Sequence, residues 1–164
     1  MAIFHFSVKL LSRSKGRSAI AAAAYRHALR IRDERAGTIH DYRRKAGVAH
    51  SEILAPPGTP NWVIDRTKLW NAMERFEKRR DAQLSREIEV ALPAELTDVE
   101  RLDLVRGWVA AQLTAHGMIA DLAIHEPGSA GASRTHHAHI MTTLRPIVGA
   151  PAFPCWMVWV SSCA

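Results

Sequence analysis

The sequence contains very little cysteine. Its 164 residues include only Cys155 and Cys163, and both lie within the last ten positions. Neither a disulfide framework nor a cysteine-ligated zinc site can therefore organise the body of the chain. Any metal ion bound there must be held by His, Asp or Glu side chains.

Long hydrophobic runs are also missing. No uninterrupted apolar run approaches the roughly 18 to 20 residues that cross a bilayer. Residues 1–11 lack the long apolar region and the small-residue cleavage site of a signal peptide. We therefore expect a cytoplasmic protein with no membrane insertion. Apolar residues still make up 48% of the chain, which is enough for the core of one globular domain.

Acidic residues are scarce in the first part of the chain. Residues 1–45 contain 11 Lys and Arg but only 3 Asp and Glu, whereas residues 46–164 contain 11 and 13. The net charge of +6 therefore arises from the amino-terminal segment. A local excess of this kind favours a phosphate backbone as partner over a neutral metabolite. The alternative is a solvated basic surface without a ligand.

Hydrophobic patterning predicts an α+β fold. The expected elements, in order, are a strand over 2–10, a helix over 19–26, a short strand over 50–54, a helix from 60 or 65 to about 81, a strand over 84–92, a helix that begins at the capping-box spacing Thr97–Glu100 and ends at 116–117, and strands over 118–126 and 137–144. Residues 29–45 are highly charged and are expected to form a mobile basic loop or an irregular helix end. This order predicts a largely antiparallel sheet with helices packed on one face.

Two of the predicted strands have faces that can be specified. In the first, the apolar residues at the even positions from Phe4 to Leu10 alternate with other residues and are expected to form a buried face. In the strand over 84–92, Glu87 and Glu89 project from the same face. These two carboxylates are candidates for a general base, an orienting group or a partner to a metal-bound histidine, or they simply form a polar surface.

Three histidines form a candidate metal site. His137 and His139 project from the same face of a predicted strand, which is the geometry that two imidazoles need to bind one cation. If the last two strands pair as a hairpin, His125 lies beside them. Three imidazoles leave coordination positions for water or a phosphate oxygen. The alternative is that the histidines of this strand are structural.

Tyr25 follows an alanine-rich helical segment and is one of two tyrosines in the chain. A phenol in such a helix is usually a core residue, but Lys15, Arg17, Arg26 and Arg30 are close in sequence. A phenolate nucleophile, whose reference pKa is about 10, needs cations or a metal nearby. Such a site would also attract a phosphodiester.

Eight segments together carry a family resemblance. They are Phe6-Ser-Val-Lys, Ser12-Arg-Ser-Lys-Gly-Arg-Ser18, Ala21-Ala-Ala-Ala-Tyr-Arg26, Asp41-Tyr-Arg-Arg-Lys45, His50-Ser-Glu-Ile-Leu54, Leu69-Trp-Asn-Ala72, Arg86-Glu-Ile-Glu-Val-Ala-Leu-Pro93 and His137-Ala-His-Ile-Met141. From about residue 1 to Arg145, this ordered set resembles the MobA/MobL (MobQ-type) conjugative relaxases, including the amino-terminal domain of TraA-like transfer proteins.

The resemblance implies a palm-like sheet of the HUH endonuclease type and metal-dependent nicking of one DNA strand at a plasmid's origin of transfer. Tyr25 would attack the scissile phosphate and give a 5′-phosphotyrosyl link and a free 3′-hydroxyl. His125, His137 and His139 match the metal ligands of the family, with Mg²⁺ or Mn²⁺ as cofactor, and Glu87 and Glu89 match its acidic strand motif.

The partners implied are single-stranded or supercoiled plasmid DNA at the origin of transfer and other relaxosome or coupling proteins. The basic residues expected to bind DNA are Arg13, Lys15, Arg17, Arg26, Arg30, Arg43, Arg44 and Lys45.

The sequence departs from the family pattern at two places. Thr135-His136 precede the His-Ala-His segment where the family usually has Asn-Pro. Residues 146–164 contain no charged side chain, whereas the family continues into a charged segment. We therefore expect a relaxase domain over residues 1–145 and an atypical tail over 146–164 that is translated in another frame, which makes the chain a truncated relaxase. Two alternatives remain: a non-catalytic DNA-binding remnant and a small histidine-metal hydrolase.

Overall fold

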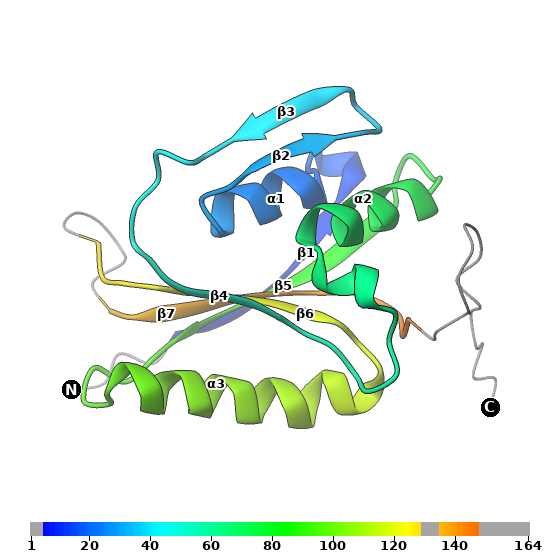
Figure 1. The fold of residues 1–164 in the computed structure, drawn as a ribbon. Helices are drawn as coiled ribbons and strands as arrows, with labels where there is room; N and C mark the ends of the chain where they lie inside the picture. Colours follow the sequence, from blue (N-terminus) through cyan, green and yellow to red (C-terminus); the bar gives the residue numbers. More distant parts are fainter. Residues whose placement is uncertain (1–4, 129–134, 148–164) are drawn as a thin grey trace.

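A five-stranded antiparallel sheet forms the centre of the fold (Figure 1). The structure is a computed structural model, and it describes residues 5–128 and 135–147. The strands are β1 (Phe6–Ser12), β4 (Val48–Leu54), β5 (Gln83–Ala91), β6 (Ala120–His125) and β7 (His137–Thr142). Their order across the sheet is β1-β5-β7-β6-β4, so the two carboxy-terminal strands lie in its interior.

Helices cover both faces of this sheet. Helices α1 (Ala19–Arg26) and α2 (Arg66–Phe76) lie on one face, and α3 (Asp98–Gln112) lies on the other (Figure 1). Met141 of β7 packs with the first pair, whereas the neighbouring Ile140 packs with α3. The α+β class and the antiparallel sheet are confirmed, but the expectation that the helices share one face is wrong. Every residue of β6 and β7 is buried, and a sheet with two buried faces needs cover on both sides.

Strand β1 exposes the face that was expected to be buried. Phe6, Val8 and Leu10 are 46%, 50% and 42% exposed. They point to the same side as α3, because Val8 is paired with Ile88, a residue of the core beneath that helix. However, β1 is the edge strand, and α3 lies under the central strands. Phe6 contacts Trp108 of the helix, with the two rings edge to face at 6.4 Å.

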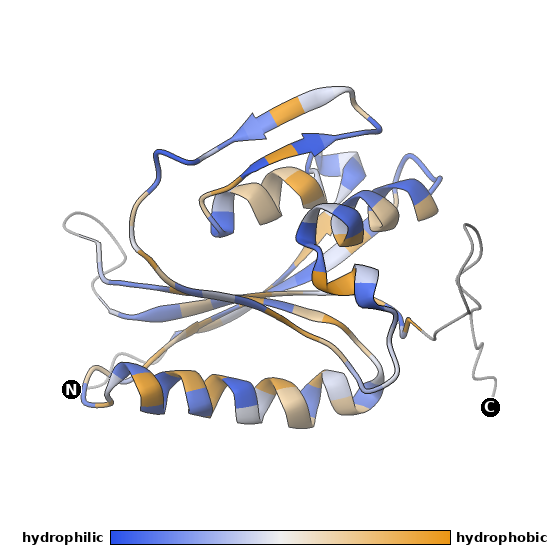
Figure 2. Ribbon diagram, viewed as in Figure 1, coloured by the Kyte–Doolittle hydropathy of each residue, from blue (hydrophilic) through white to orange (hydrophobic). Residues whose placement is uncertain are grey.

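A second sheet replaces the predicted mobile loop. Strands β2 (Arg30–Asp33) and β3 (Thr38–Asp41) form an antiparallel hairpin that lies over α1 (Figure 1). Figure 2 shows that both strands are largely hydrophilic, but Ile31 is buried against the core of α1 and α2. A four-residue strand with a single buried apolar residue has too short a pattern to be distinguished from a loop in the sequence.

The remaining elements agree with the predicted order. The capping box of α3 is present, because the Thr97 side chain accepts from Glu100 N and the Glu100 side chain accepts from Thr97 N. Asp65 caps α2. The short 3₁₀ helices are η1 (Arg13–Lys15), η2 (Asn61–Ile64) and η3 (Thr114–His116).

Only the start of the predicted tail belongs to the described residues. Ile147 is buried in the core of α1 and α2, and Pro146 lies against Gly117. The rest of the uncharged tail, residues 148–164, lies outside the described residues. The expected change of frame concerns this part of the chain. Within the described residues, no helix is both long enough and apolar enough to cross a membrane.

Candidate metal and tyrosine site

The three predicted histidines converge on one face of the sheet. Strands β6 and β7 pair with His125 opposite His137, and His139 follows two residues later on the same face of β7. The three ring centroids are 5.0 to 5.2 Å apart. One ligand atom from each residue lies within 4.8 Å of the others, and all three residues are buried. The predicted pairing that brings His125 to the couple is confirmed.

Each imidazole also has a second contact that fixes its orientation. His125 Nε2 lies 2.7 Å from the carbonyl oxygen of Arg26, and His137 Nδ1 lies 3.1 Å from that of Thr135. His139 Nδ1 lies 3.2 Å from Glu87 Oε1. Carbonyl oxygens only accept hydrogen bonds, so His125 Nε2 and His137 Nδ1 carry hydrogen and the other nitrogen of each of these rings presents a lone pair. The nearby Glu87 carboxylate favours hydrogen on Nδ1 of His139 in the same way.

The protonation states of His125 and His139 suit metal binding. Burial, together with the charge of Lys45 and the neighbouring imidazoles, lowers the pKa of His125 to about 4, against the hydrogen bond to Arg26. Burial also lowers the pKa of His139. Both rings are therefore neutral near pH 7, which is the form that binds a cation. Three convergent imidazoles fit a divalent ion with further positions open.

Glu87 lies beside this triad on β5. Its carboxylate is buried between His139 and the guanidinium of Arg26. Burial raises the pKa of Glu87, but the hydrogen bonds from His139 and Arg26 outweigh it and bring the pKa to about 2. The carboxylate is therefore ionised at neutral pH and holds the His139 ring. Sequence reasoning assigned Arg26 to DNA and missed this contact, because the two residues are 61 positions apart.

Glu89 is on the same face of β5 but points to the other strand. Its carboxylate lies 3.4 Å from Lys9 Nζ and 3.8 Å from His5 Nε2, both from the β1 side. Burial raises the pKa of Glu89, but the interactions with His139 and Lys9 outweigh it and leave this pKa below its usual range. Glu89 is the register partner of His139, but its carboxylate contacts His5 and Lys9 at the edge of the sheet.

Tyr25 is at the carboxyl end of α1 and is 43% exposed. Lys45 Nζ lies 4.1 Å from the centroid of its ring and donates to the Tyr25 carbonyl oxygen at 3.2 Å. The Arg26 guanidinium lies 5.2 Å from the same centroid, and the ring of Tyr42 meets it edge to face at 5.2 Å. Burial and the charge of Arg26 lower the pKa of Lys45. The phenol is thus accessible and surrounded by cations.

The next residue links this tyrosine to the triad. Arg26 accepts from His125 through its backbone carbonyl and binds Glu87 through its side chain. The turn that follows Tyr25 is therefore attached directly to a candidate metal ligand and to the residue that orients another.

The other predicted DNA-binding residues do not form one surface. Lys15 and Arg17 are exposed just before the amino end of α1, and about 9 Å of helix separates that end from Tyr25. At the other end Arg44 is exposed, and Arg30 and Arg43 share the carboxylate of Asp41.

Arg13 is turned inward. Its guanidinium donates to the carbonyl oxygens of Glu74, Glu77 and Arg79 and to the Glu74 carboxylate. Both terminal nitrogens of its guanidinium are therefore engaged at the end of α2, and we do not include Arg13 in a DNA surface.

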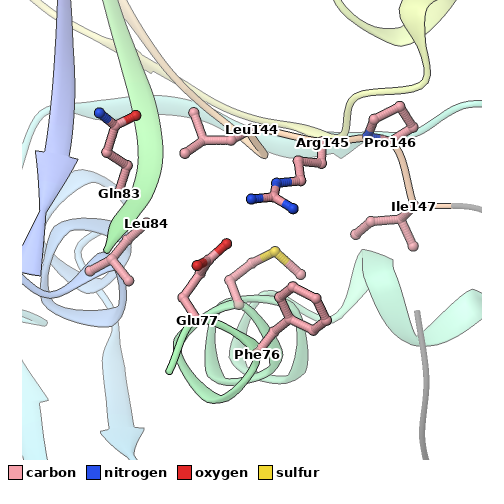
Figure 3. A pocket seen from close by; sticks show the side chains of 9 residues that line it. Phe76, Glu77, Gln83, Leu84, Leu144, Arg145, Pro146 and Ile147 are labelled. Atoms are coloured by element: carbon pink, nitrogen blue, oxygen red, sulfur yellow. The ribbon is translucent and has the colours of Figure 1, made fainter. Parts of the chain in front are cut away.

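The pocket in Figure 3 lies beyond the opposite end of β7 from the triad. Leu144, Arg145 and Phe76 are among the residues that line it, and its volume is about 20 Å³. This space holds little more than one water molecule. It is a packing gap and not a ligand site.

Comparison with known proteins identifies related sequences. The sequence model of the MobA/MobL family matches residues 17–153. The chain is 44% identical over 158 residues to a probable conjugal transfer protein TraA of Sinorhizobium fredii, a match that covers 90% of this chain and 14% of the relative. It is 50% identical over 127 residues to the mobilization protein MobL of Acidithiobacillus ferridurans, covering 77% of this chain and 33% of the relative.

A solved structure gives the same result. The structure reported as the molecular basis of vancomycin resistance transfer in Staphylococcus aureus superposes with a TM-score of 0.80 at 34% identity, over 89% of this chain and 72% of the other. The chain spans only a seventh to a third of the length of the two curated relatives named above. By its sequence match, its fold and its relatives, this chain belongs to the MobA/MobL family.

Proposed function

We propose that this chain is a conjugative relaxase domain that nicks one DNA strand at a plasmid's origin of transfer, with Tyr25 as nucleophile. One observation carries the proposal: a buried triad of convergent histidines is hydrogen-bonded to the turn that follows an accessible tyrosine. The names of the relatives, a conjugal transfer protein and a mobilization protein, support the same reaction.

In the proposed reaction, the Tyr25 phenol loses its proton and its oxygen attacks the scissile phosphorus. The bond between phosphorus and the 3′ oxygen breaks, and that oxygen takes up a proton and leaves as a 3′-hydroxyl. The 5′ side of the break stays on the protein as a phosphotyrosyl ester. Because one ester replaces another, the bond can be reformed later without ATP. Arg26 and Lys45 lie against the Tyr25 ring and favour the phenolate during attack.

The triad is the proposed site of Mg²⁺ or Mn²⁺. When bound there, the ion would polarise the phosphate and offset charge on its non-bridging oxygens. The chain's own residues hold the ligands in place: the Arg26 carbonyl orients His125, and the Glu87 carboxylate orients His139. Such contacts behind the ligands keep the ring orientation and the tautomer needed for binding.

The DNA would be held by exposed cations around α1. Lys15 and Arg17 at one end and Arg30, Arg43 and Arg44 at the other can follow a phosphate backbone that passes Tyr25. We propose plasmid DNA at the origin of transfer, single-stranded or supercoiled, as the substrate, with other relaxosome or coupling proteins as partners in the whole transfer reaction. The proposed setting is the cytoplasm.

The test is to incubate the purified chain with the supercoiled plasmid of its host and Mn²⁺ and to look for an SDS-resistant protein–DNA adduct. We expect an adduct that is absent in Tyr25→Phe and persists in Tyr42→Phe, which makes the same change at the other tyrosine. Binding of DNA without any adduct would favour a non-catalytic DNA-binding remnant. Metal-dependent hydrolysis that Tyr25→Phe leaves intact would favour a small histidine-metal hydrolase.

A further inference from the structure

A buried ionic cluster lies under the turn that follows Tyr25, and the proposed reaction does not use it. At its centre is Asp121 of β6, which is completely buried. Arg66 and Trp70 of α2 donate to its carboxylate at 2.8 to 2.9 Å, and His27 Nε2 lies 3.0 Å from Asp121 Oδ1. The other nitrogen of His27 is 2.7 Å from the hydroxyl of Ser51 on β4.

Buried ion pairs seldom add net stability over apolar packing, because both charges must first be desolvated. A cluster of this kind is better explained by what it positions. His27 is the second residue after Tyr25, and its ring is held over neighbouring strands, since Ser51 and Asp121 belong to β4 and β6, which pair with each other. The cluster therefore ties the end of α1 to the sheet that carries the triad.

The backbone of this turn needs such a constraint. Ala28 has φ of 52°, a left-handed conformation that is disfavoured for a residue with a Cβ. The amides of His27 and Leu29 on either side close the helix on the carbonyls of Ala23 and Ala24, at 3.1 and 2.9 Å. A strained turn persists only where its surroundings hold it, and the ring of His27 is the buried side chain next to it.

We propose that His27, through Asp121 and Ser51, is a positioning residue that holds Tyr25 in register with the histidine triad. This inference rests on the proposed function, because it assigns to His27 the placement of the proposed nucleophile. Within the described residues, the polar contacts of the His27 ring are with Asp121 and Ser51, so it acts on Tyr25 through the turn. Loss of the contact displaces Tyr25 relative to the triad while the exposed cations and the triad stay in place.

The experiment measures adduct formation by the full chain with the supercoiled host plasmid and Mn²⁺, as a function of plasmid concentration. For His27→Gln we expect the maximal rate to fall by about 10- to 100-fold, with little change in the plasmid concentration that gives half the maximal rate. The matched control is His116→Gln, the same change at an exposed histidine beyond α3, which should keep both values. Measurements are made well below the melting temperature of each variant.

Two further readouts separate positioning from loss of stability. Ala28→Gly relieves the disfavoured backbone conformation, so the double variant with His27→Gln should regain part of the lost rate. Hydrogen exchange of the His27 and Leu29 amides should be faster in His27→Gln than in the unsubstituted chain and His116→Gln, because these amides close the turn.

The outcomes decide between the two proposals. A His27→Gln variant with the rate of the unsubstituted chain, or one that changes only the plasmid concentration needed, overturns the positioning role. A double variant as slow as His27→Gln also overturns it. If the unsubstituted chain forms no adduct, the proposed function fails, and the amide exchange then decides by itself whether His27 holds the turn.

Discussion

At the residue scale, neighbouring cations have different surroundings and different expected roles. Lys45 lies over the Tyr25 ring and donates to the Tyr25 carbonyl, whereas Arg44 beside it is exposed. A partly desolvated cation over an aromatic face contributes about 0.5 to 2 kcal/mol. Part of this energy can stabilise the Tyr25 ring when it becomes negatively charged during attack.

We therefore expect Lys45→Met to slow adduct formation at saturating plasmid by about 3- to 30-fold. Arg44→Met should instead weaken plasmid binding and leave the maximal rate within about twofold, since one phosphate contact adds to affinity alone. Both values come from the rate measured against plasmid concentration. Equal effects of the two substitutions on the maximal rate would contradict the role given to Lys45.

The two glutamates of β5 also differ. Glu87 contacts His139, whereas Glu89 contacts Lys9 and His5. Loss of a residue that orients a metal ligand typically weakens metal affinity by about 10- to 100-fold. We expect a weakening of that size for Mn²⁺ in Glu87→Gln and a smaller one in Glu89→Gln, as measured by calorimetric titration. Similar affinities in the two variants would show that Glu87 does not orient the triad.

At the element scale, Glu74 joins the ends of two helices. Its carboxylate accepts from Ala19 N, the first residue of α1, and from Arg13, whose guanidinium also binds carbonyl oxygens at the end of α2. Both side chains are largely buried, at 4% and 12% exposure. Arg13 is therefore a structural link between η1, α1 and α2, whereas Arg17, four residues later, is exposed.

This difference gives a prediction for the two arginines. Arg13→Met should lower the free energy of unfolding by about 3 to 5 kcal/mol, because the buried Glu74 carboxylate loses the guanidinium with which it is paired. Arg17→Met should change it by less than about 0.5 kcal/mol and should weaken plasmid binding. Urea unfolding and a gel-shift titration check the two effects. A stable Arg13→Met variant with weakened plasmid binding would reverse the assignment.

At the scale of the whole molecule, two ion pairs join helices on opposite faces to the same sheet. Asp121 of β6 binds Arg66 of α2, and Glu52 of β4 binds Arg106 of α3 through two hydrogen bonds. The Arg106 hydrogen bonds hold the pKa of Glu52 below its usual range. Burial alone would raise the pKa of Asp121, but His27 and Arg66 keep it lowered.

A carboxyl group whose pKa is lower in the folded than in the unfolded state stabilises the fold at higher pH. This stabilisation is lost as the pH falls through the pKa of the unfolded state toward that of the folded state. The free energy of unfolding, measured in urea without metal, should therefore decrease as the pH drops below the ordinary carboxyl values of 4.5 and 3.8. Glu52→Gln should make this decrease shallower. An equal slope in this variant would exclude the Glu52–Arg106 pair as a source of the pH dependence.

Much of the fold and part of the site could be predicted from local patterns. The spacing of His137 and His139 places both rings on one face of a strand, whatever the rest of the chain does. The capping box at Thr97 determines where α3 begins, because the two reciprocal hydrogen bonds involve residues three positions apart. Glu87 and Glu89 share a face for the same local reason.

Contacts between distant residues were decided only by the tertiary structure. His125 joins the triad because β6 pairs with β7 in one register. Arg26 is paired with Glu87, a residue 61 positions away in the sequence. The alternating apolar residues of β1 do not reveal that this strand lies at the edge of the sheet. The sequence by itself determined which side chains share an element, since periodicity is local. The sheet order determined which elements share a site, since burial and ion pairing depend on neighbours far away in the chain.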